Sequence, residues 1–459
     1  MSAVLLIAIP LLVAFVSILS KKLAPWLLLA TPIANLVLLF LVPTGIVVIG
    51  GFQPPFGISL LLDTYSFIAL FAVNALVFVI GLLNVKEYHQ FSSILLVALA
   101  GLNGLILTND LFNLFVFLEI AGIAAYLIAA SNKKPASVFH YLVLGAVGSS
   151  FYLFGLIILY AMFGTLNMVD MIEKINAATV SASALILPFF LMFVGLGVEA
   201  KLLPFNSWVK GVLGSSNTMS GPMFASVYAV TVSFVFGRLL NNLFAFQGNL
   251  LVVVVAILLL GIALGEAMAF SSKKAREILL YSSIAQASVV ILLFVNGLVL
   301  WGALLAVANA VSKFVLFYVV TKAQKEVGCD DLDSLQGMFQ GNYVVGVAFS
   351  VAALSVIGIP LFAGFVLKLG YLTELAANAN WLAIAVILVA SLVEGIYYVR
   401  MLVKLWYPGE KEVKVSFGNV ATVVIALAAA LLLVFGVYRG PIDNLDNTID
   451  SVSEVIDLG

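Results

Sequence analysis

The sequence predicts an all-α polytopic membrane protein of about fourteen transmembrane helices, and three observations support that fold class. Of the 459 residues, 64% are hydrophobic and 9% are charged, whereas soluble globular domains are about 45–50% apolar and about 25% charged. Apolar stretches of about 20 residues, the length that crosses a bilayer, recur along the whole chain. Two of these stretches are interrupted by proline or glycine beside a lysine, at residues 198–205 and 358–368.

The predicted spans follow one another with short links. The segment 1–20 has no basic region before its apolar run and no small-residue cleavage motif, so we expect a retained helix rather than a removed signal peptide. No stretch between the spans is long or polar enough to form a soluble domain. The apolar segments cover residues 3–20, 25–48, 64–84, 92–108, 111–131, 137–163, 185–212, 219–240, 249–270, 278–296, 299–321, 343–375, 381–407 and 417–438.

The basic residues predict the orientation, because inner loops of membrane proteins are enriched in lysine and arginine. With the N-terminus outside, only Lys174 and Arg439 fall in outer segments. We therefore expect both termini to lie outside, where the acidic tail at 443–457 also falls. The basic residues in or beside inner loops would be Lys21, Lys22, Lys86, Lys133, Lys134, Lys210, Lys273, Lys274, Arg276, Lys322, Lys325, Arg400, Lys404, Lys411 and Lys414.

The two interrupted spans predict an internal repeat. They are five spans apart, and an odd offset reverses the direction in which a helix crosses the membrane. Paired broken helices in inverted repeats are typical of proteins with an ion site near the bilayer midplane. We therefore expect one membrane domain over residues 1–459, with two inverted five-helix repeats. Its parts would be N-terminal helices at 1–90, a first repeat at 91–245, a second repeat at 246–410, and a last helix with the acidic tail at 411–459.

The composition also excludes several functions. Cys329 is the only cysteine, so neither a disulfide framework nor a cysteine-ligated cluster can form within the chain. Two histidines, His89 and His140, are too few and too far apart in sequence for a haem pair or a zinc site. We therefore expect no cofactor, no metal and no redox centre in this chain. A net charge of −1 without a basic patch argues against nucleic acid as a partner.

Five ionisable side chains within the predicted spans are candidates for a proton pathway. Charges inside a bilayer are costly, so residues of this kind are functional candidates by default. Each can instead form a fixed ion pair that only holds helices together, and that alternative stays open. The five candidates are Glu119, Glu199, Lys201, Lys313 and Lys368.

The interruptions themselves have a chemical reason to hold charge. Pro204 has no N–H to donate to the carbonyl of Ala200, four residues back, and freed carbonyls attract water or cations. Gly358 and Pro360 interrupt the second span in the same way. Glu199 and Lys201 are two residues apart and point to different helix faces, so which of them acts stays open.

Three further ionisable residues are second-tier candidates. Glu266 lies a turn or two from the basic run at 273–276, so it would serve either a relay or an interfacial pair. Glu394 would relay protons or dock a neighbouring subunit. His140 opens its span near Lys134, and we expect an ordinary structural role for it more often than a functional one. We expect Arg238, near the outer end of its span, to extend toward the interface.

Several segments over roughly residues 60–410 carry a family resemblance. They are Phe-Leu-Glu119 followed by Tyr126, His140-Tyr141-Leu-Val-Leu-Gly, Pro204-Phe-Asn-Ser-Trp208, Lys274 to Gln286, Asn309 with Lys313, and Gly358-Ile-Pro through Lys368. In these segments the chain resembles the antiporter-like subunits shared by respiratory complex I, the membrane-bound hydrogenases and sulfur reductases, and multisubunit cation/proton antiporters.

The resemblance implies fourteen helices with inverted repeats, two broken helices, and a central hydrated axis of Glu and Lys through which protons move. By position, Glu119 matches the family's glutamate and Lys368 its second-break lysine. Lys313 matches the lysine of the family's His-x-x-x-Lys segment. The chain departs from the pattern at three places. Glu199 stands where the family has its first-break lysine, Asn309 replaces the histidine, and residues 225–236 hold no basic residue.

The sequence thus predicts an antiporter-like, proton-translocating subunit of a respiratory complex in the cell membrane. Its partners would be other membrane subunits, including antiporter-like and hydrogenase- or quinone-type subunits, and redox chemistry in those partners would drive it. One alternative is a sodium/proton exchange subunit of a multisubunit antiporter. Another is a structural membrane subunit whose charges form static pairs.

Overall fold

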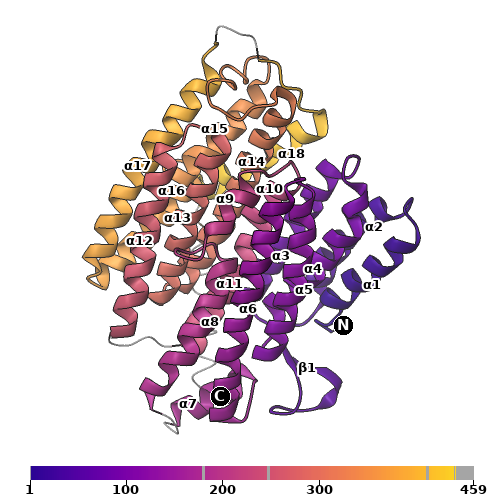
Figure 1. Ribbon diagram of the computed structural model, residues 1–459, viewed down its shortest axis with the longest axis vertical. Coiled ribbons are helices and arrows are strands. Elements are labelled where there is room, and N and C mark those ends of the chain that lie inside the picture. Colours follow the sequence, from indigo (N-terminus) through magenta and orange to yellow (C-terminus); the bar gives the residue numbers. More distant parts are fainter. Residues whose placement is uncertain (1, 178–180, 245–248, 410–412, 439, 441–459) are drawn as a thin grey trace. The chain divides into compact units, whose positions relative to one another are not determined.

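The computed structural model describes residues 2–177, 181–244, 249–409, 413–438 and 440, and nearly all of them are helical (Figure 1). The acidic tail, Arg439 and Lys411 lie outside the described residues. The chain divides into two compact units. Unit 1 comprises Met1–Val212 and Val230–Val254, and unit 2 comprises Leu213–Ala229 and Val255–Gly459.

The elements of unit 1 are mostly helices, with one small hairpin. The helices are α1 (Leu5–Leu19), α2 (Ala24–Leu41), α3 (Thr64–Asn84), α4 (Ser92–Leu107), α5 (Leu111–Ala130), α6 (Pro135–Phe163), α7 (Met168–Asn176), α8 (Ile186–Glu199), α9 (Ser207–Leu213) and most of α11 (Ala229–Asn242). Short 3₁₀ turns are η1 (Ile49–Gly51), η2 (His89–Phe91) and η3 (Ala182–Leu185). Strand β1 (Gly45–Val48) pairs antiparallel with β2 (Ser59–Leu62).

Unit 2 contains the remaining helices. They are α10 (Ser220–Pro222), the π-helical segment η4 (Met223–Tyr228), most of α12 (Asn249–Ser271), α13 (Ala275–Val295), α14 (Val299–Val327), α15 (Tyr343–Ile357), α16 (Ala363–Ala377), α17 (Trp381–Trp406) and α18 (Asn419–Val437). The predicted span at 219–240 therefore consists of three consecutive pieces, α10, η4 and α11. The division between the units falls within it, after Ala229.

The helices confirm the all-α polytopic fold class. Every predicted apolar segment contains at least one of them. Within the described residues, 11 helices are long and apolar enough to cross a membrane by length and composition. One boundary was wrong: the predicted span at 25–48 ends as helix at Leu41, and the chain then enters the β1–β2 hairpin. Pro43 and Gly45 follow directly, and both residue types disfavour continuing a helix.

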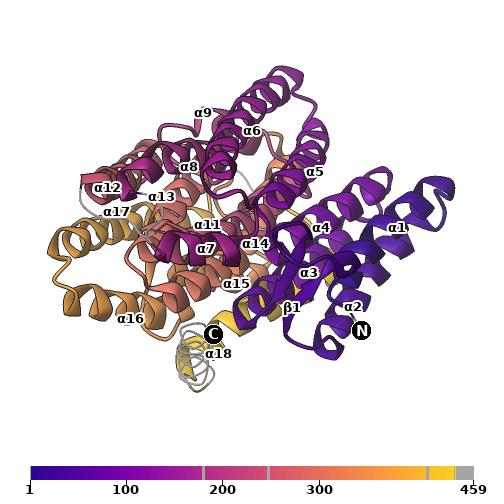
Figure 2. The ribbon, with the colours of Figure 1, turned by 90° about the horizontal axis from the view of Figure 1, so that it is seen from below.

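Four helices at the beginning of unit 1, α1 to α4, lie side by side (Figures 1 and 2) and share a buried polar core. Pro10 within α1 cannot bond to the carbonyl of Leu6, four residues earlier. The Leu6 oxygen instead accepts the side-chain amides of Asn35 at 3.2 Å and Asn103 at 2.9 Å. Asn74 joins them, accepting from Asn35 and donating to Asn103, each at 3.1 Å. One proline thus provides the acceptor that links α1 to α2 and α4.

Glycines bring α6 and α8 into close contact, which sets the position of the site in unit 1. A β-carbon at Gly195 would lie 2.6 Å from the carbonyl oxygen of Gly148, and one at Gly155 would lie 2.5 Å from that of Pro188. Only residues without a side chain allow backbones to approach so closely. Small residues serve the same purpose at many helix contacts in membranes.

Both predicted interruptions are gaps between helices. In unit 1, α8 ends at Glu199 and α9 begins at Ser207, and the intervening Lys201 has a φ of 62°. In unit 2, α15 ends at Ile357 and α16 begins at Ala363, and between them Gly358 and Leu361 have φ values of 83° and 82°. Residues other than glycine rarely adopt positive φ, so both gaps contain strained backbone, which tends to occur at functional sites.

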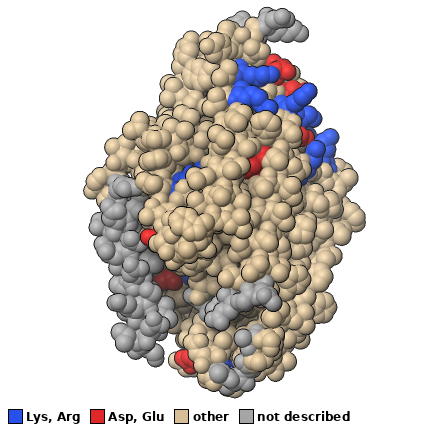
Figure 3. All heavy atoms as spheres, turned by 90° about the vertical axis from the view of Figure 1, so that its left-hand side faces the viewer, with Lys and Arg blue, Asp and Glu red and all other residues tan. Residues whose placement is uncertain are grey.

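Helix α17 shows how the helices of unit 2 divide between an outer and an inner face. Leu388, Leu392 and Ile396, four residues apart, form an exposed apolar stripe, with Leu392 68% exposed. Glu394 and Tyr398 are buried on the same helix. Figure 3 shows a face of the molecule on which uncharged residues cover most of the area and charged side chains gather near one end. This arrangement, apolar outside and polar within, suits a helix bundle in lipid.

Arg238 corrects one expectation from the sequence. It does not extend toward an interface: its side chain is buried, with the residue 6% exposed. Its guanidinium donates to Ser66 Oγ at 2.7 Å and to the carbonyl oxygen of Ile106 at 2.9 Å, and it lies 3.3 Å from Asp63 Oδ1. Asp63 also caps the N-terminus of α3. The end of α4 and the beginning of α3 supply partners that the sequence of its own span does not reveal.

Candidate functional site

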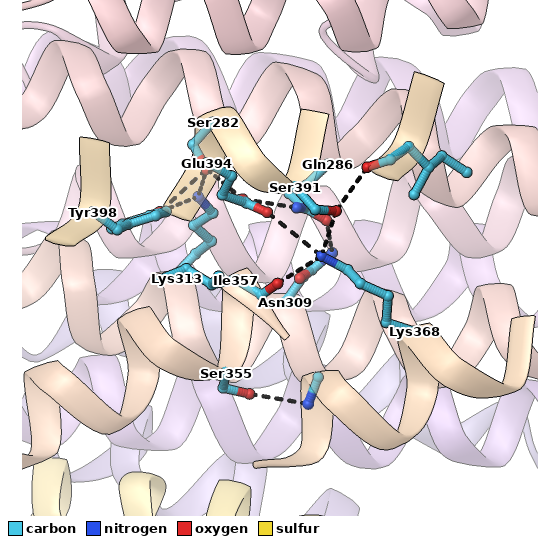
Figure 4. Close-up of polar contacts among 12 residues, drawn as sticks. Ser282, Gln286, Asn309, Lys313, Ser355, Ile357, Lys368, Ser391, Glu394 and Tyr398 are labelled. Carbon is cyan, nitrogen blue, oxygen red and sulfur yellow. Dashed lines mark hydrogen bonds and ion pairs between the residues drawn. The ribbon is translucent and has the colours of Figure 1, made fainter. Parts of the chain in front are cut away.

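The largest group of buried ionisable residues in the described part of unit 2 centres on Glu394. Figure 4 shows Glu394 of α17 between Lys313 of α14 and Lys368 of α16, with α13 supplying Ser282 and Gln286. Glu394 is 1% exposed and Lys313 is 2% exposed. A buried ion is tolerated only when other charges and hydrogen bonds compensate it, and the neighbours of this group supply both.

Lys313 is held by hydroxyl groups. Its Nζ donates to Ser282 Oγ at 2.6 Å and to the hydroxyl of Tyr398 at 2.9 Å. The ammonium also lies 5.6 Å from the centre of the Tyr398 ring, within the range of a cation–π interaction. Because Ser282 Oγ lies 3.5 Å from Glu394 Oε1, one hydroxyl lies between the lysine and the carboxylate.

Glu394 accepts a second, stronger hydrogen bond from an amide. Gln286 Nε2 donates to Glu394 Oε1 at 2.9 Å, and Asn309 Nδ2 donates to Gln286 Oε1 at 3.2 Å. Asn309 therefore reaches the carboxylate through Gln286. An asparagine cannot carry a proton at this position, but it fixes the orientation of the glutamine amide.

Lys368 lies at the second helix break. Its Nζ donates to the carbonyl oxygen of Ile357, the last residue of α15, at 2.7 Å and to Ser391 Oγ at 2.9 Å, and it lies 3.8 Å from Glu394 Oε2. The side chain passes close to Gly358, where a β-carbon would lie 3.0 Å from Lys368 Cδ. The break thus supplies both an acceptor and the space for this lysine.

Glu266 of α12 extends the group. It is 3% exposed and interacts electrostatically with Glu394, Lys313 and Lys368. Its carboxyl group and the hydroxyl of Tyr397 on α17 are both buried and interact with each other. Two carboxyl groups and two amino groups therefore share one buried region. Gain or loss of one proton there changes the energy of every other charge.

Unit 1 holds the other predicted candidates near its helix break. Glu199, at the end of α8, accepts a hydrogen bond from Tyr141 of α6 at 3.1 Å. Glu119 of α5 is partly buried and interacts electrostatically with Glu199 and with Tyr126. Both groups are carboxyls, which is the consequence of finding Glu199 where the family resemblance leads one to expect lysine.

The remaining candidates lie at different places. Lys201 is buried within the break that follows α8, and Pro204 lies three residues further on, in the same gap between helices. His140 is on α6 with its side chain exposed. Pro360 lies between α15 and α16, two residues after Gly358. The structure thus brings Lys313, Lys368, Glu394 and Glu266 together in unit 2 and relates Glu119 to Glu199 in unit 1.

Several polar partners at the site were missed at the level of sequence, although a signal was present. Three helices each present polar residues three or four apart, which places them on one face. Single serines and amides in apolar spans are common, so only the recurrence on three helices would have indicated a shared site. The residues are Ser282 and Gln286 on α13, Asn309 and Lys313 on α14, and Ser391, Glu394 and Tyr398 on α17.

The fold and the buried ionisable groups define an integral multi-pass membrane protein with a charged interior. Residues 108–393 match the family model described as "NADH:quinone oxidoreductase/Mrp antiporter, TM". The chain is also 30% identical to NADH-quinone oxidoreductase subunit N of Desulforudis audaxviator (strain MP104C) over 377 residues, which are 79% of this chain and 75% of that one. The chain therefore belongs to the NADH:quinone oxidoreductase/Mrp antiporter family of membrane proteins.

Solved structures agree with this assignment. A chain in the structure of the membrane-bound sulfane sulfur reductase, an archaeal respiratory membrane complex, is 27% identical, with a TM-score of 0.91 and 99% of each chain covered. A chain of the Mrp complex from Dietzia sp. DQ12-45-1b is 20% identical, with a TM-score of 0.85 and 95% of this chain and 94% of that one covered. That second likeness concerns the fold alone. The family resemblance seen in the sequence is confirmed, while the roles of individual site residues stay a prediction.

Proposed function

We propose that this chain is an antiporter-like subunit of a membrane respiratory complex and that it moves protons through its buried Glu and Lys side chains. The observation that carries the proposal is the position of Glu394. It lies 3.8 Å from Lys368 and is joined to Lys313 through Ser282. A carboxylate between two amines can exchange its partner when any one of the three changes its charge.

The proton would move by stepwise changes of charge. A proton that arrives at Glu394 neutralises the carboxylate and removes the attraction that stabilises the ammonium of Lys368. Lys368 can then release its proton while its nitrogen stays bonded to Ile357 and Ser391. On the other side, the hydroxyls of Ser282 and Tyr398 connect Glu394 to Lys313, since a hydroxyl both donates and accepts.

The energy for this movement would come from neighbouring subunits. With one cysteine and two histidines in the sequence, the chain offers few ligands for a redox centre of its own. Its relatives are named for NADH-quinone oxidoreductase and occur in a sulfane sulfur reductase complex. We assign the chain to an assembly of this kind, with other membrane subunits as its partners.

The placement in the membrane belongs to the same proposal. The distribution of lysines and arginines supports a position in the cell membrane with both termini outside. The two helix breaks, after Glu199 and after Ile357, support the division into two inverted repeats at 91–245 and 246–410. Reactivity of single cysteines introduced into the links between spans, tested from each side of intact cells, would check the orientation.

The decisive experiment uses the purified native complex in proteoliposomes, with redox turnover and proton uptake measured together. Glu394→Gln keeps the shape and the hydrogen bond from Gln286 but removes the charge. We expect proton uptake per turnover to fall by this subunit's share. The matched control is Glu374→Gln on α16, where the side chain is exposed. We expect it to leave uptake unchanged.

Two outcomes would contradict the proposal. If Glu394→Gln pumps as well as the control, the carboxylate is a static structural partner. If uptake instead requires sodium and collapses with the sodium gradient, the chain belongs to the exchange class. Lys313→Met should reproduce the effect of Glu394→Gln, because both residues lie on the same route.

A further inference from the structure

We propose that Tyr141 is the positioning residue of Glu199, and that Tyr141 and Trp208 together tie this carboxyl group to the first helix break. The proposal rests on the proposed function, since it takes Glu199 to carry a proton. It concerns unit 1 only. It assigns a role to the aromatic side chains that lie beside this carboxyl group.

The first observation is a direct hydrogen bond. The hydroxyl of Tyr141 donates to Glu199 Oε2 at 3.1 Å. Tyr141 is fully buried on α6, and Glu199 is the last residue of α8. A donor to a carboxylate stabilises its charged form in particular. Tyr141 therefore influences how readily Glu199 takes up a proton as well as where its oxygens lie.

The second observation is that the ring of Tyr141 is held on two sides. The ring of Trp208 stacks on it with a centroid distance of 4.0 Å and an interplanar angle of 17°. The ring of Tyr126 meets it edge-on at 4.8 Å and 84°. Stacked and edge-on contacts are the two favoured aromatic geometries. The ring is therefore in contact with aromatic neighbours on two sides while its hydroxyl reaches Glu199.

The third observation connects this arrangement to the break. Trp208 of α9 donates its indole N–H to the carbonyl oxygen of Val198 at 3.0 Å. Val198 immediately precedes Glu199, and its carbonyl also accepts the backbone N–H of Lys201 at 3.2 Å. A closed path therefore runs from the carboxyl of Glu199 through Tyr141 and Trp208 back to Val198, the residue directly before Glu199. The geometry of the break and the position of the carboxyl are set together.

Other titratable side chains also lie near Glu199 in the described part of unit 1. From α5, Glu119 and Tyr126 interact with it electrostatically. Glu119 is a carboxyl like Glu199, and an ionised carboxyl group only accepts hydrogen bonds. Tyr126 holds the ring of Tyr141, and Lys201 follows in the break. Loss of the Tyr141 hydroxyl would therefore remove a stabilising donor while the second carboxyl stays in place.

The test is the pH profile of proton translocation by the intact complex in proteoliposomes. Tyr141→Phe keeps the ring and its stacking but removes the hydroxyl. We expect the pH of half-maximal translocation to move upward by about half a unit to one unit, because a lost hydrogen bond then disfavours the charged carboxylate. The matched control is Tyr152→Phe on the same helix, a buried tyrosine whose hydroxyl donates to the carbonyl oxygen of Leu111 at 3.1 Å. It should leave the profile unchanged.

A second pair of variants separates failure of this inference from failure of the proposed function. If Glu199→Gln translocates protons normally, Glu199 is not a carrier and the proposed function is wrong at this residue. If Glu199→Gln impairs translocation but Tyr141→Phe behaves like Tyr152→Phe, only the positioning role is wrong. If the role is correct, adding Tyr141→Phe to Glu199→Gln produces no further shift. Trp208→Phe, which loses the indole N–H, should shift the profile in the same direction as Tyr141→Phe.

Discussion

The ammonium of Lys368 bonds the carbonyl oxygen of Ile357 at 2.7 Å while it lies 3.8 Å from Glu394 Oε2. One cation therefore serves two negative groups, the carboxylate and the C-terminal end of α15, where the helix dipole is negative. The helix break can hold the lysine whether or not the carboxylate is charged. This is what a site needs if its ion pair is to open and close without disordering the helices around it.

Replacing Lys368 should abolish translocation at some cost in stability. Lys368→Met keeps the length of the side chain but leaves Glu394 without its ammonium neighbour, and breaking a buried pair costs about 3–5 kcal/mol. We expect a lower thermal midpoint and no proton uptake by this subunit. The control Lys273→Met changes an exposed lysine and should leave both unchanged. Equal uptake in the two variants would contradict the pathway through Lys368.

Substitution of Gly358 should have two separate effects, one on stability and one on proton uptake. Its φ is 83°, and an added β-carbon would lie 3.0 Å from Lys368 Cδ. Gly341 has a similar φ of 81° but nothing within 4 Å. Both Gly358→Ala and Gly341→Ala should lose about 1–2 kcal/mol through backbone strain. Only Gly358→Ala should also lower proton uptake per assembled complex. If the two variants pump equally, displacement of Lys368 is not the cause of any defect.

Arg238 should affect stability without affecting transport. Arg238→Lys keeps the charge but cannot donate to Ser66 and Ile106 with the planar fork of a guanidinium. We expect a loss of about 1–3 kcal/mol, measured as a fall in the thermal midpoint of the complex. Proton uptake per assembled complex should equal that of the wild type. A specific fall in uptake with unchanged stability would show that Arg238 has a part in transport.

The asparagine core of α1 to α4 should be another purely structural site. Asn103→Ala leaves the carbonyl of Leu6 and the amide of Asn74 each with one partner fewer, which should cost about 1–2 kcal/mol. The control is Asn241→Ala on α11, whose side chain bonds the carbonyl of Gly237 in its own helix at 2.7 Å. The midpoint of thermal unfolding of the complex should be lower for Asn103→Ala than for Asn241→Ala. A similar midpoint for both variants would contradict a role for Asn103 in joining helices.

The sequence was sufficient to predict the helices, because a bilayer requires each span to have about the same length and to be mostly apolar. It also singled out Lys313 and Lys368 as candidates, since a charge in the middle of an apolar run stands out regardless of its partners; their roles stay a prediction. The same logic placed Glu394 only in the second tier, although it lies between the two lysines. Its importance depends on which helices pack around α17, and that is a property of the tertiary structure.

Two other results show the same limit. Arg238 was expected at an interface because it lies near the outer end of its span, while its actual partners are 130 or more residues away along the chain. The span predicted at 25–48 included strand β1, because the residues of this strand are apolar. Hydropathy measures the preference for a nonpolar environment and does not by itself separate an apolar strand from the end of a helix.

Pro10 has a consequence for the order in which the chain assembles in the membrane. When α1 enters the bilayer as the first span, the carbonyl of Leu6 lacks its helical donor, and lipid offers no substitute. Its two donors arrive later, Asn35 with α2 and Asn103 with α4. The polar contacts of α1 are therefore incomplete until both α2 and α4 have packed against it. Biogenesis of this end of the protein should proceed as a cooperative four-helix event.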